Sequence, residues 1–207
     1  MSFSDTLLPM ALFALATSAT PGQVNVISAM TGASFGPIRT IPYVMGATTS
    51  FVSILLLLGL GLGVVLEWIG RFSPAFIVVG SAYMLWLAFR IATDCGKGHS
   101  ETKYQRCPDF KAGLITQVVN PKAWIVSLSA ISVYVAPHVE YNSRLAVFAA
   151  IFAVVCTASL FGWAVIGFRV ARLSGDVSTF NKIMAGVLTF SVFMILIEEF
   201  YKSNIRI

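Results

Sequence analysis

The sequence is 207 residues long, and 57% of its residues are hydrophobic while only 11% are charged. Soluble domains usually contain about 25% charged residues, so this composition excludes a soluble protein and predicts an integral membrane protein. The net charge of +5 is typical of basic membrane loops that attract anionic lipid. It requires no nucleic-acid partner.

Six apolar segments are long enough to cross a bilayer, because about 20 apolar residues in a helix span a hydrocarbon core of roughly 30 Å. In chain order they cover residues 6–30, 43–66, 74–92, 112–136, 145–168 and 183–201. Strands of a membrane barrel would alternate in hydrophobicity, whereas runs such as Ile54–Leu58 are continuously apolar. The sequence therefore predicts an all-α integral membrane protein in which residues 1–207 form a single transmembrane domain.

The first apolar segment is interrupted by Thr20-Pro21-Gly22. Proline inside a helix removes a hydrogen bond and clashes with the preceding turn, so we expect two half-helices here. The small residues before this break are typical of a signal-peptidase site, but a signal peptide begins with basic residues. Asp5 is the only charge ahead of the segment, and we expect a mature membrane helix.

Glycines follow this break and continue into the second segment. Gly32 and Gly36 end the first segment, while Gly46 and the run from Gly59 to Gly63 belong to the second. Small residues about four positions apart let helix backbones approach closely in lipid. A nucleotide-binding glycine loop would need a preceding strand, so these glycines are interpreted as helix-packing positions.

A polar linker over residues 93–109 divides the chain into halves of three spans, residues 1–100 and 108–207. Two related units with an odd number of spans insert in opposite orientations, as in the inverted repeats of many secondary carriers. Most Lys and Arg residues of the loops lie on the side of this linker. Because basic loops stay in the cytoplasm, both termini are predicted to be periplasmic, and Cys95 and Cys107 in the linker are expected to be reduced thiols.

The fourth segment carries a matching break at Asn120-Pro121-Lys122. Thr20 and Asn120 are good N-cap residues, and a proline in the next position suits the first residue of a helix. Each break is therefore predicted to start a half-helix inside the membrane, with an N-terminal end that attracts a carboxylate. The prolines also free the carbonyls of Thr17 and Gln117, so the breaks offer partners for both ends of an amino-acid zwitterion.

Polar side chains surround both breaks. Gln117 and Asn120 are three residues apart and Pro21 and Asn25 are four apart, spacings that place side chains on one helical face. Lys122 lies inside an apolar span, where a cation costs roughly 2.5 to 3.5 kcal/mol on insertion. The predicted substrate-binding residues are Thr20, Pro21, Gly22, Gln23, Asn25, Gln117, Asn120, Pro121 and Lys122.

Two roles for Lys122 are open from the sequence. It binds the substrate carboxylate and exchanges a proton during the transport cycle, because buried lysines lose their proton readily. Alternatively, it snorkels or binds freed carbonyls and only holds the fold together.

In their order and spacing these motifs resemble the LysE/RhtB family of amino-acid exporters, over essentially the whole chain. The matching segments are Thr20-Pro21-Gly22, the glycines Gly32, Gly36 and Gly46, Gly80-Ser81-Ala82-Tyr83, Phe110-Lys111-Ala112-Gly113-Leu114 and Asn120-Pro121-Lys122-Ala123. The resemblance implies a secondary active, proton-driven exporter of amino acids or close derivatives in the bacterial inner membrane. It is nearest to the branch that includes the cysteine and O-acetylserine exporter. The family usually reads Thr-Pro-Gly-Pro at the first break, and Gln23 replaces the second proline.

Other classes of membrane protein fit these residues less well. A thiol-disulfide carrier needs cysteines in the first and fourth spans, a divalent-metal exporter needs acidic residues inside the membrane, and the sequence has neither. An intramembrane hydrolase built on Lys122 and Ser127 has no visible third group. We therefore expect no enzyme activity, cofactor or metal. The alternative is a non-transport assembly or scaffold subunit, and the oligomeric state is open, a homo-oligomer included.

Overall fold

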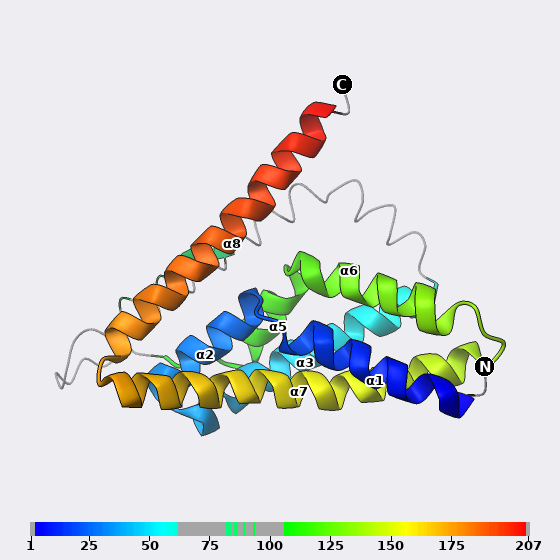
Figure 1. Ribbon diagram of the computed structural model, residues 1–207, viewed down its shortest axis with the longest axis horizontal. Helices are drawn as coiled ribbons and strands as arrows, with labels where there is room; N and C mark the ends of the chain where they lie inside the picture. Colours follow the sequence, from blue (N-terminus) through cyan, green and yellow to red (C-terminus); the bar gives the residue numbers. More distant parts are fainter. Residues whose placement is uncertain are drawn as a thin grey trace.

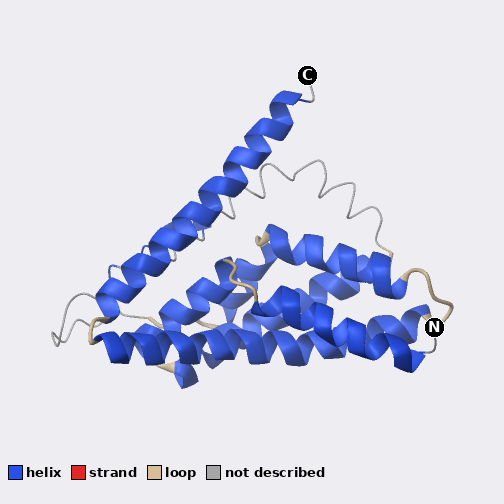
Figure 2. Cartoon of the chain, viewed as in Figure 1, coloured by secondary structure: helices blue, strands red, loops and turns tan. Residues whose placement is uncertain are grey.

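The computed structural model describes residues 3–61 and 106–205, together with Ala82, Tyr83, Leu85, Trp86, Phe89 and Thr93. Every element in this described part is a helix (Figure 2). The elements are α1 (Phe3–Ala19), α2 (Gln23–Phe35), α3 (Pro37–Gly59), α5 (Phe110–Val118), α6 (Pro121–Ala130), the π-helical turn η1 (Ile131–Val135), α7 (Tyr141–Ser174) and α8 (Val177–Ile205). Most of the predicted third span, 74–92, and most of the 93–109 linker lie outside the described residues.

Up to four of the described segments can cross a membrane by length and composition. α3 and α7 qualify as single helices, and α1 with α2 and α5 with α6 and η1 qualify as bent pairs. The prediction of an all-α, multi-pass membrane protein is therefore confirmed. The predicted sixth span, 183–201, lies within α8, which is not among these four.

The second span differs from its predicted bounds of 43–66. α3 begins at Pro37 and ends at Gly59, and Gly61 follows with a φ of 76°. A residue in this left-handed region commonly ends a helix. Gly61 is therefore a helix stop, and its interpretation as a packing position was wrong.

The fifth span begins earlier than its predicted bounds of 145–168, because α7 starts at Tyr141 and Arg144 lies inside it. Its side chain is only 1% exposed. The guanidinium donates to the hydroxyl of Thr6 in α1 at 2.7 Å and to the carboxylate of Glu140 at 3.3 Å. This buried cation ties the start of α1 to the start of α7.

The crossing of α2 with α7 depends on two glycines. A Cβ atom on Gly32 would overlap the backbone of Ala164, and one on Gly167 would overlap the backbone of Ala29. The helix backbones therefore touch directly, as small residues allow in lipid. The packing interpretation of Gly32 is confirmed, and Gly167 contributes the same contact from the other helix.

The crossing of α3 with α5 is built in the same way. A Cβ atom on Gly46 would overlap the backbone of Phe110, and one on Gly113 would overlap that of Tyr43. The packing interpretation of Gly46 is confirmed. The two glycine crossings thus join the first predicted span to the fifth and the second to the fourth.

Two apolar cores lie on either side of the chain breaks. α1 and α6 pack into one core, where Phe51, Phe148 and Phe152 stack, while α2 and α8 pack into the other around Tyr43 and Leu188. α3 and α7 run through both cores. In Figure 1, α1 and α2 lie along α7, and α8 diverges from the bundle. Each bent segment therefore changes core at its break.

Candidate functional site

The first break does not have the local structure that we predicted. α1 ends at Ala19, and the Thr20 hydroxyl turns back to donate to the carbonyl of Thr17 at 3.1 Å. The N-cap of α2 is Gly22, in an extended conformation with φ −151° and ψ 174°, and no described side chain caps this helix end. The two helices are bent by 62°. Thr20 is therefore not an N-cap, and that prediction was wrong.

The second break does have the predicted structure. Asn120 is the N-cap of α6, with Pro121 in the first turn, and its side-chain oxygen accepts from the backbone N–H of Lys122 at 3.2 Å. Its amide nitrogen donates to Gln117 Oε1 at 3.0 Å. α5 and α6 are bent by 68°. The predicted cap at Asn120 is confirmed, and its side chain meets that of Gln117 as their spacing predicted.

Lys122 connects the two breaks. Its Nζ donates to the Thr20 hydroxyl at 2.9 Å and to the Thr20 carbonyl at 3.2 Å, across 102 residues of sequence. A Cβ atom built on Gly22 would lie 3.5 Å from the same nitrogen. The ammonium group therefore lies at the N-terminal end of α2.

The end of α2 is open toward an anion, whereas the end of α6 is not. The first N–H groups of a helix have no intrahelical acceptor, and in α2 these belong to Gln23, Val24 and Asn25. In α6 the first position is Pro121, which has no N–H, and the next N–H is bonded to Asn120. An anion at the end of α2 would meet open amides, the positive end of the helix dipole and the Lys122 ammonium.

The carbonyls near the breaks already accept hydrogen bonds. That of Thr17 accepts from the Thr20 hydroxyl, that of Gln117 accepts from the N–H of Asn120 at 3.2 Å, and that of Ser18 accepts from Asn25 Nδ2 at 2.8 Å. A carbonyl oxygen has a second lone pair, so these groups still offer acceptors to an ammonium. Asn25 reaches back across the break, which corrects the predicted helical face shared by Pro21 and Asn25, because Pro21 lies outside α2.

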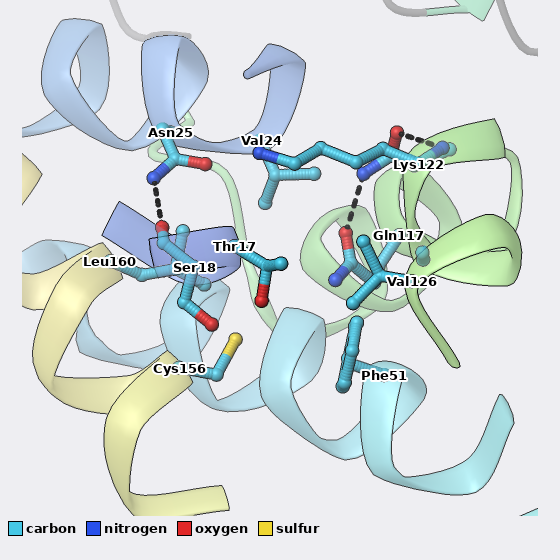
Figure 3. A pocket seen from close by; sticks show the side chains of 12 residues that line it. Thr17, Ser18, Val24, Asn25, Phe51, Gln117, Lys122, Val126, Cys156 and Leu160 are labelled. Carbon is cyan, nitrogen blue, oxygen red and sulfur yellow. Dashed lines mark hydrogen bonds between the residues drawn. The ribbon is translucent and has the colours of Figure 1, made fainter. Parts of the chain in front are cut away.

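A cavity of about 30 Å³ lies between the breaks (Figure 3). Its lining residues are Thr17, Ser18, Val24, Asn25, Phe51, Gln117, Asn120, Lys122, Ala123, Val126, Cys156 and Leu160. Roughly 10 to 15 Å³ of such space is enough for one water molecule, whereas a cavity that binds benzene measures about 150 Å³. The cavity in this conformation therefore has room for water and is too small for an amino acid.

The cavity brings together only part of the predicted set. Asn25, Gln117, Asn120 and Lys122 line it. The other predicted residues, Thr20, Pro21, Gly22, Gln23 and Pro121, lie at the breaks without lining it. Gln23 is only 6% exposed, and its Oε1 atom has no hydrogen-bond partner among the described residues.

Sequence reasoning missed the walls of the cavity. Phe51 comes from α3, Val126 from α6, and Cys156 and Leu160 come from α7. None of them differs from the apolar residues that face lipid in the same helices, so the sequence carries no signal for them. Ser18 was detectable only as a polar residue next to the first break, and Thr17 was predicted only for its freed carbonyl.

The described residues include no group of three or more His, Cys, Asp or Glu side chains that could hold a metal ion. Cys107 is a free thiol at the start of α5 that donates to the carbonyl of Arg39 at 3.2 Å. Burial raises the pKa of Cys107 to about 11, so this thiol is largely protonated at neutral pH. Cys95 lies outside the described residues.

Comparisons with known proteins identify the family of this chain. The family model of the LysE type translocator matches residues 15–198. The Cysteine/O-acetylserine efflux protein of Klebsiella pneumoniae subsp. pneumoniae is 26% identical over 187 residues, 90% of this chain and 94% of that protein. The proteins of the same name from Escherichia coli K12 and Shigella flexneri serotype 5b are each 30% identical over 166 residues, 78% of this chain and 82% of theirs. No solved structure matches the chain. Because the family model covers most of its length, the chain belongs to the LysE type translocator family.

Proposed function

We propose that this protein exports amino acids or close derivatives across the bacterial inner membrane, and that the two facing breaks form the substrate site. The observation that carries this proposal is the Lys122 ammonium, which lies at the open N-terminal end of α2. The bonds from Lys122 to Thr20 join an ammonium to neutral oxygens, whereas a carboxylate carries a full negative charge that also attracts the ammonium through Coulomb interaction. A substrate carboxylate therefore competes well with the neutral oxygens of Thr20 for Lys122.

The substrate ammonium group needs acceptors on the other side of the site. The carbonyls of Thr17 and Ser18 and the side-chain oxygen of Asn25 surround that position, and Asn25 Oδ1 lies 3.6 Å from where a Cβ atom on Gly22 would be. These neutral oxygens suit an ammonium group without requiring a buried carboxylate. The site thus has complementary groups for both ends of a zwitterion.

Substrate binding requires the site to open, because its cavity of about 30 Å³ is about a fifth of the roughly 150 Å³ of a cavity that binds benzene. The Lys122 bonds to Thr20 join the two halves of the chain across the cavity. A carboxylate that takes over the ammonium releases this link. In our proposal, substrate binding and the separation of the two breaks are therefore the same event. Lys122 is the group that would gain and lose a proton during the transport cycle.

The proposed arrangement has six spans in two inverted halves. Contacts between the spans support it, because a pseudo-two-fold axis that exchanges the first span with the fourth also exchanges the second with the fifth. Both α1 and α2 contact α7, and their counterparts α5 and α6 both contact α3. The two glycine crossings involve α2 and α5, which lie on opposite sides of their breaks and are not counterparts. The relatives are named as efflux proteins, which favours transport over an assembly or scaffold role.

The test is a counterflow assay with purified protein in liposomes and labelled neutral amino acids, cysteine and O-acetylserine among them. Lys122→Met is expected to reach the membrane at normal or higher abundance, because the cost of inserting a cation is removed, and to lose counterflow. Lys182→Met is the matched control, because Lys182 is exposed on α8 and outside the cavity. Full counterflow by Lys122→Met would disprove the site, and loss of the variant from the membrane would assign Lys122 to the fold.

A further inference from the structure

We propose that the apolar end of the cavity holds the side chain of the substrate, and that Cys156 sets the length of side chain that the site accepts. This inference rests on the proposed function, because it takes the carboxylate to be bound at Lys122. The apolar end consists of Phe51, Val126, Cys156 and Leu160. The substrate class that fits it is a neutral amino acid with a short, unbranched side chain.

The direction of the substrate follows from the two ends of the cavity. Lys122 and Asn25 lie at one end, and Cys156 lies at the other with its sulfur directed toward Thr17 (Figure 3). A substrate with its carboxylate at Lys122 and its ammonium near Ser18 and Asn25 has one direction left for its side chain. That direction leads past Thr17 to Cys156.

The charge of the lining residues selects a neutral side chain. Among the described residues that line the cavity, Lys122 is the one with a charged side chain. A cationic substrate side chain would find no acidic partner there, and an unpaired charge in an apolar pocket is strongly unfavourable. We therefore expect the apolar end to exclude lysine and arginine as substrates, even if their carboxylate and α-ammonium groups fit at the breaks.

Contacts with the core hold two walls of the apolar end in place beside Cys156. The ring of Phe51 packs against that of Phe152 with centroids 4.7 Å apart, and the carbonyl of Leu160 accepts the Ser28 hydroxyl at 2.8 Å, which fixes α7 against α2. Each wall is therefore held by a contact with a residue that does not line the cavity. The length available to a substrate is therefore set by the small side chain that closes the pocket, which is Cys156.

The test is a counterflow series with unbranched amino acids of increasing length: alanine, 2-aminobutyrate, norvaline and norleucine. Cys156→Ala should shift the preferred substrate one carbon longer, and Cys156→Leu should shift it shorter. One methylene in an apolar pocket is worth at least about tenfold in discrimination, so the ratio of norvaline to alanine counterflow should change about tenfold in opposite directions. Cys107→Ala, which changes a thiol outside the cavity, should leave the ratio unchanged.

The result separates this inference from the proposed function. If the unmodified protein gives no counterflow with any amino acid, the exporter proposal fails. If it gives counterflow but Cys156→Ala and Cys156→Leu keep its chain-length profile, only the assignment of Cys156 fails. Counterflow of lysine at the rate of alanine would also overturn the inference.

A labelling experiment keeps the inference testable if the Cys156 variants do not fold. In protein carrying Cys95→Ser and Cys107→Ser, Cys156 is the remaining thiol. N-ethylmaleimide should modify it slowly, and a saturating transported amino acid should reduce that rate several-fold, whereas lysine should not. Absence of labelling, or labelling that the transported amino acid leaves unchanged, would contradict the placement of Cys156 in the substrate pocket.

Discussion

At the scale of single residues, Gln23 is the position where this chain departs most clearly from the pattern of the family it resembles. It is the first residue of α2, and it supplies a backbone N–H and a buried side-chain oxygen that has no partner in the described structure. The N–H of a residue at this helix position has no acceptor within the helix, so proline, which lacks an N–H, loses no hydrogen bond there and is favoured. Gln23 therefore adds one donor to the open end of α2 at some cost in stability.

Gln23→Pro should increase stability and weaken substrate binding. The extended backbone of Gly22 is compatible with a following proline, which typically adds about 0.4 to 1 kcal/mol by restricting the unfolded chain. Loss of an N–H bonded to a carboxylate costs about 1.5 to 3 kcal/mol. We expect a higher unfolding temperature in detergent and a KM for counterflow that is raised at least about tenfold.

The matched variant is Gln23→Ala, which removes the unpartnered side-chain amide and keeps the N–H. It should retain the KM of the unmodified protein. If Gln23→Pro also retains that KM, then the first N–H of α2 does not contact the substrate. If Gln23→Ala raises KM as much as proline does, the side chain and not the backbone is the binding group.

At the scale of elements, the sequence predicted both breaks correctly and one of the two caps. Thr20-Pro21 and Asn120-Pro121 look equivalent as cap-proline pairs, but the next residue differs. Glycine is about 1 kcal/mol less favourable than alanine inside a helix, so α2 begins after Gly22, whereas Lys122 continues α6 directly. Thr20 is left outside the helix, where it contacts Lys122. That contact depends on tertiary structure, and sequence spacing contains no sign of it.

The glycine crossings lead to a prediction about helix packing. Gly167→Ala should destabilise the protein, because its methyl group would overlap the backbone of Ala29 and push α2 away from α7. Overpacking of this kind typically costs about 1 to 3 kcal/mol. Gly162→Ala lies five residues earlier in the same helix with no atom within 4 Å of the added methyl, so it should be neutral or slightly stabilising.

Thermal unfolding in detergent, followed by circular dichroism, compares the two variants directly. Equal unfolding temperatures for Gly167→Ala and Gly162→Ala would mean that the crossing can relax at no cost. Because α2 carries the open helix end beside Lys122, Gly167→Ala should also lower counterflow more than Gly162→Ala at equal membrane abundance.

At the scale of the whole molecule, the sequence predicted several polar residues that line the cavity but not its apolar walls. Polar or proline-containing breaks stand out in an apolar span, so Asn25, Asn120 and Lys122 could be found from the sequence alone. Phe51, Cys156 and Leu160 could not, because an apolar side chain looks the same whether it faces lipid, core or cavity. The packing of α3 and α7 against both bent segments determines which of these three environments each residue faces.

Hydrogen bonds between the helices show which turns and termini lie at the same end of the bundle. At one end, Cys107 donates to the carbonyl of Arg39 in the first turn of α3, and Asn181 of α8 donates to Ser34 near the end of α2 at 2.7 Å. At the other end, Thr6 binds Arg144, and the hydroxyl of Tyr141 donates to the carbonyl of Gly59. The end that adjoins the basic linker therefore also holds the turn between α2 and α3 and the turn between α7 and α8.

These two ends lead to a prediction of orientation. The linker end gathers the basic residues Arg39, Arg106, Lys111, Arg169, Arg172 and Lys182, and short loops rich in Lys and Arg stay in the cytoplasm. The start of α1 lies at the opposite end, and with six spans the C-terminus returns to that same side. Both termini are therefore expected in the periplasm. An alkaline phosphatase fusion after residue 207 should be active, and a fluorescent protein inserted within residues 97–106 should fluoresce. A cytoplasmic C-terminus would mean an odd number of spans, and the proposed pair of inverted three-span halves would then be wrong.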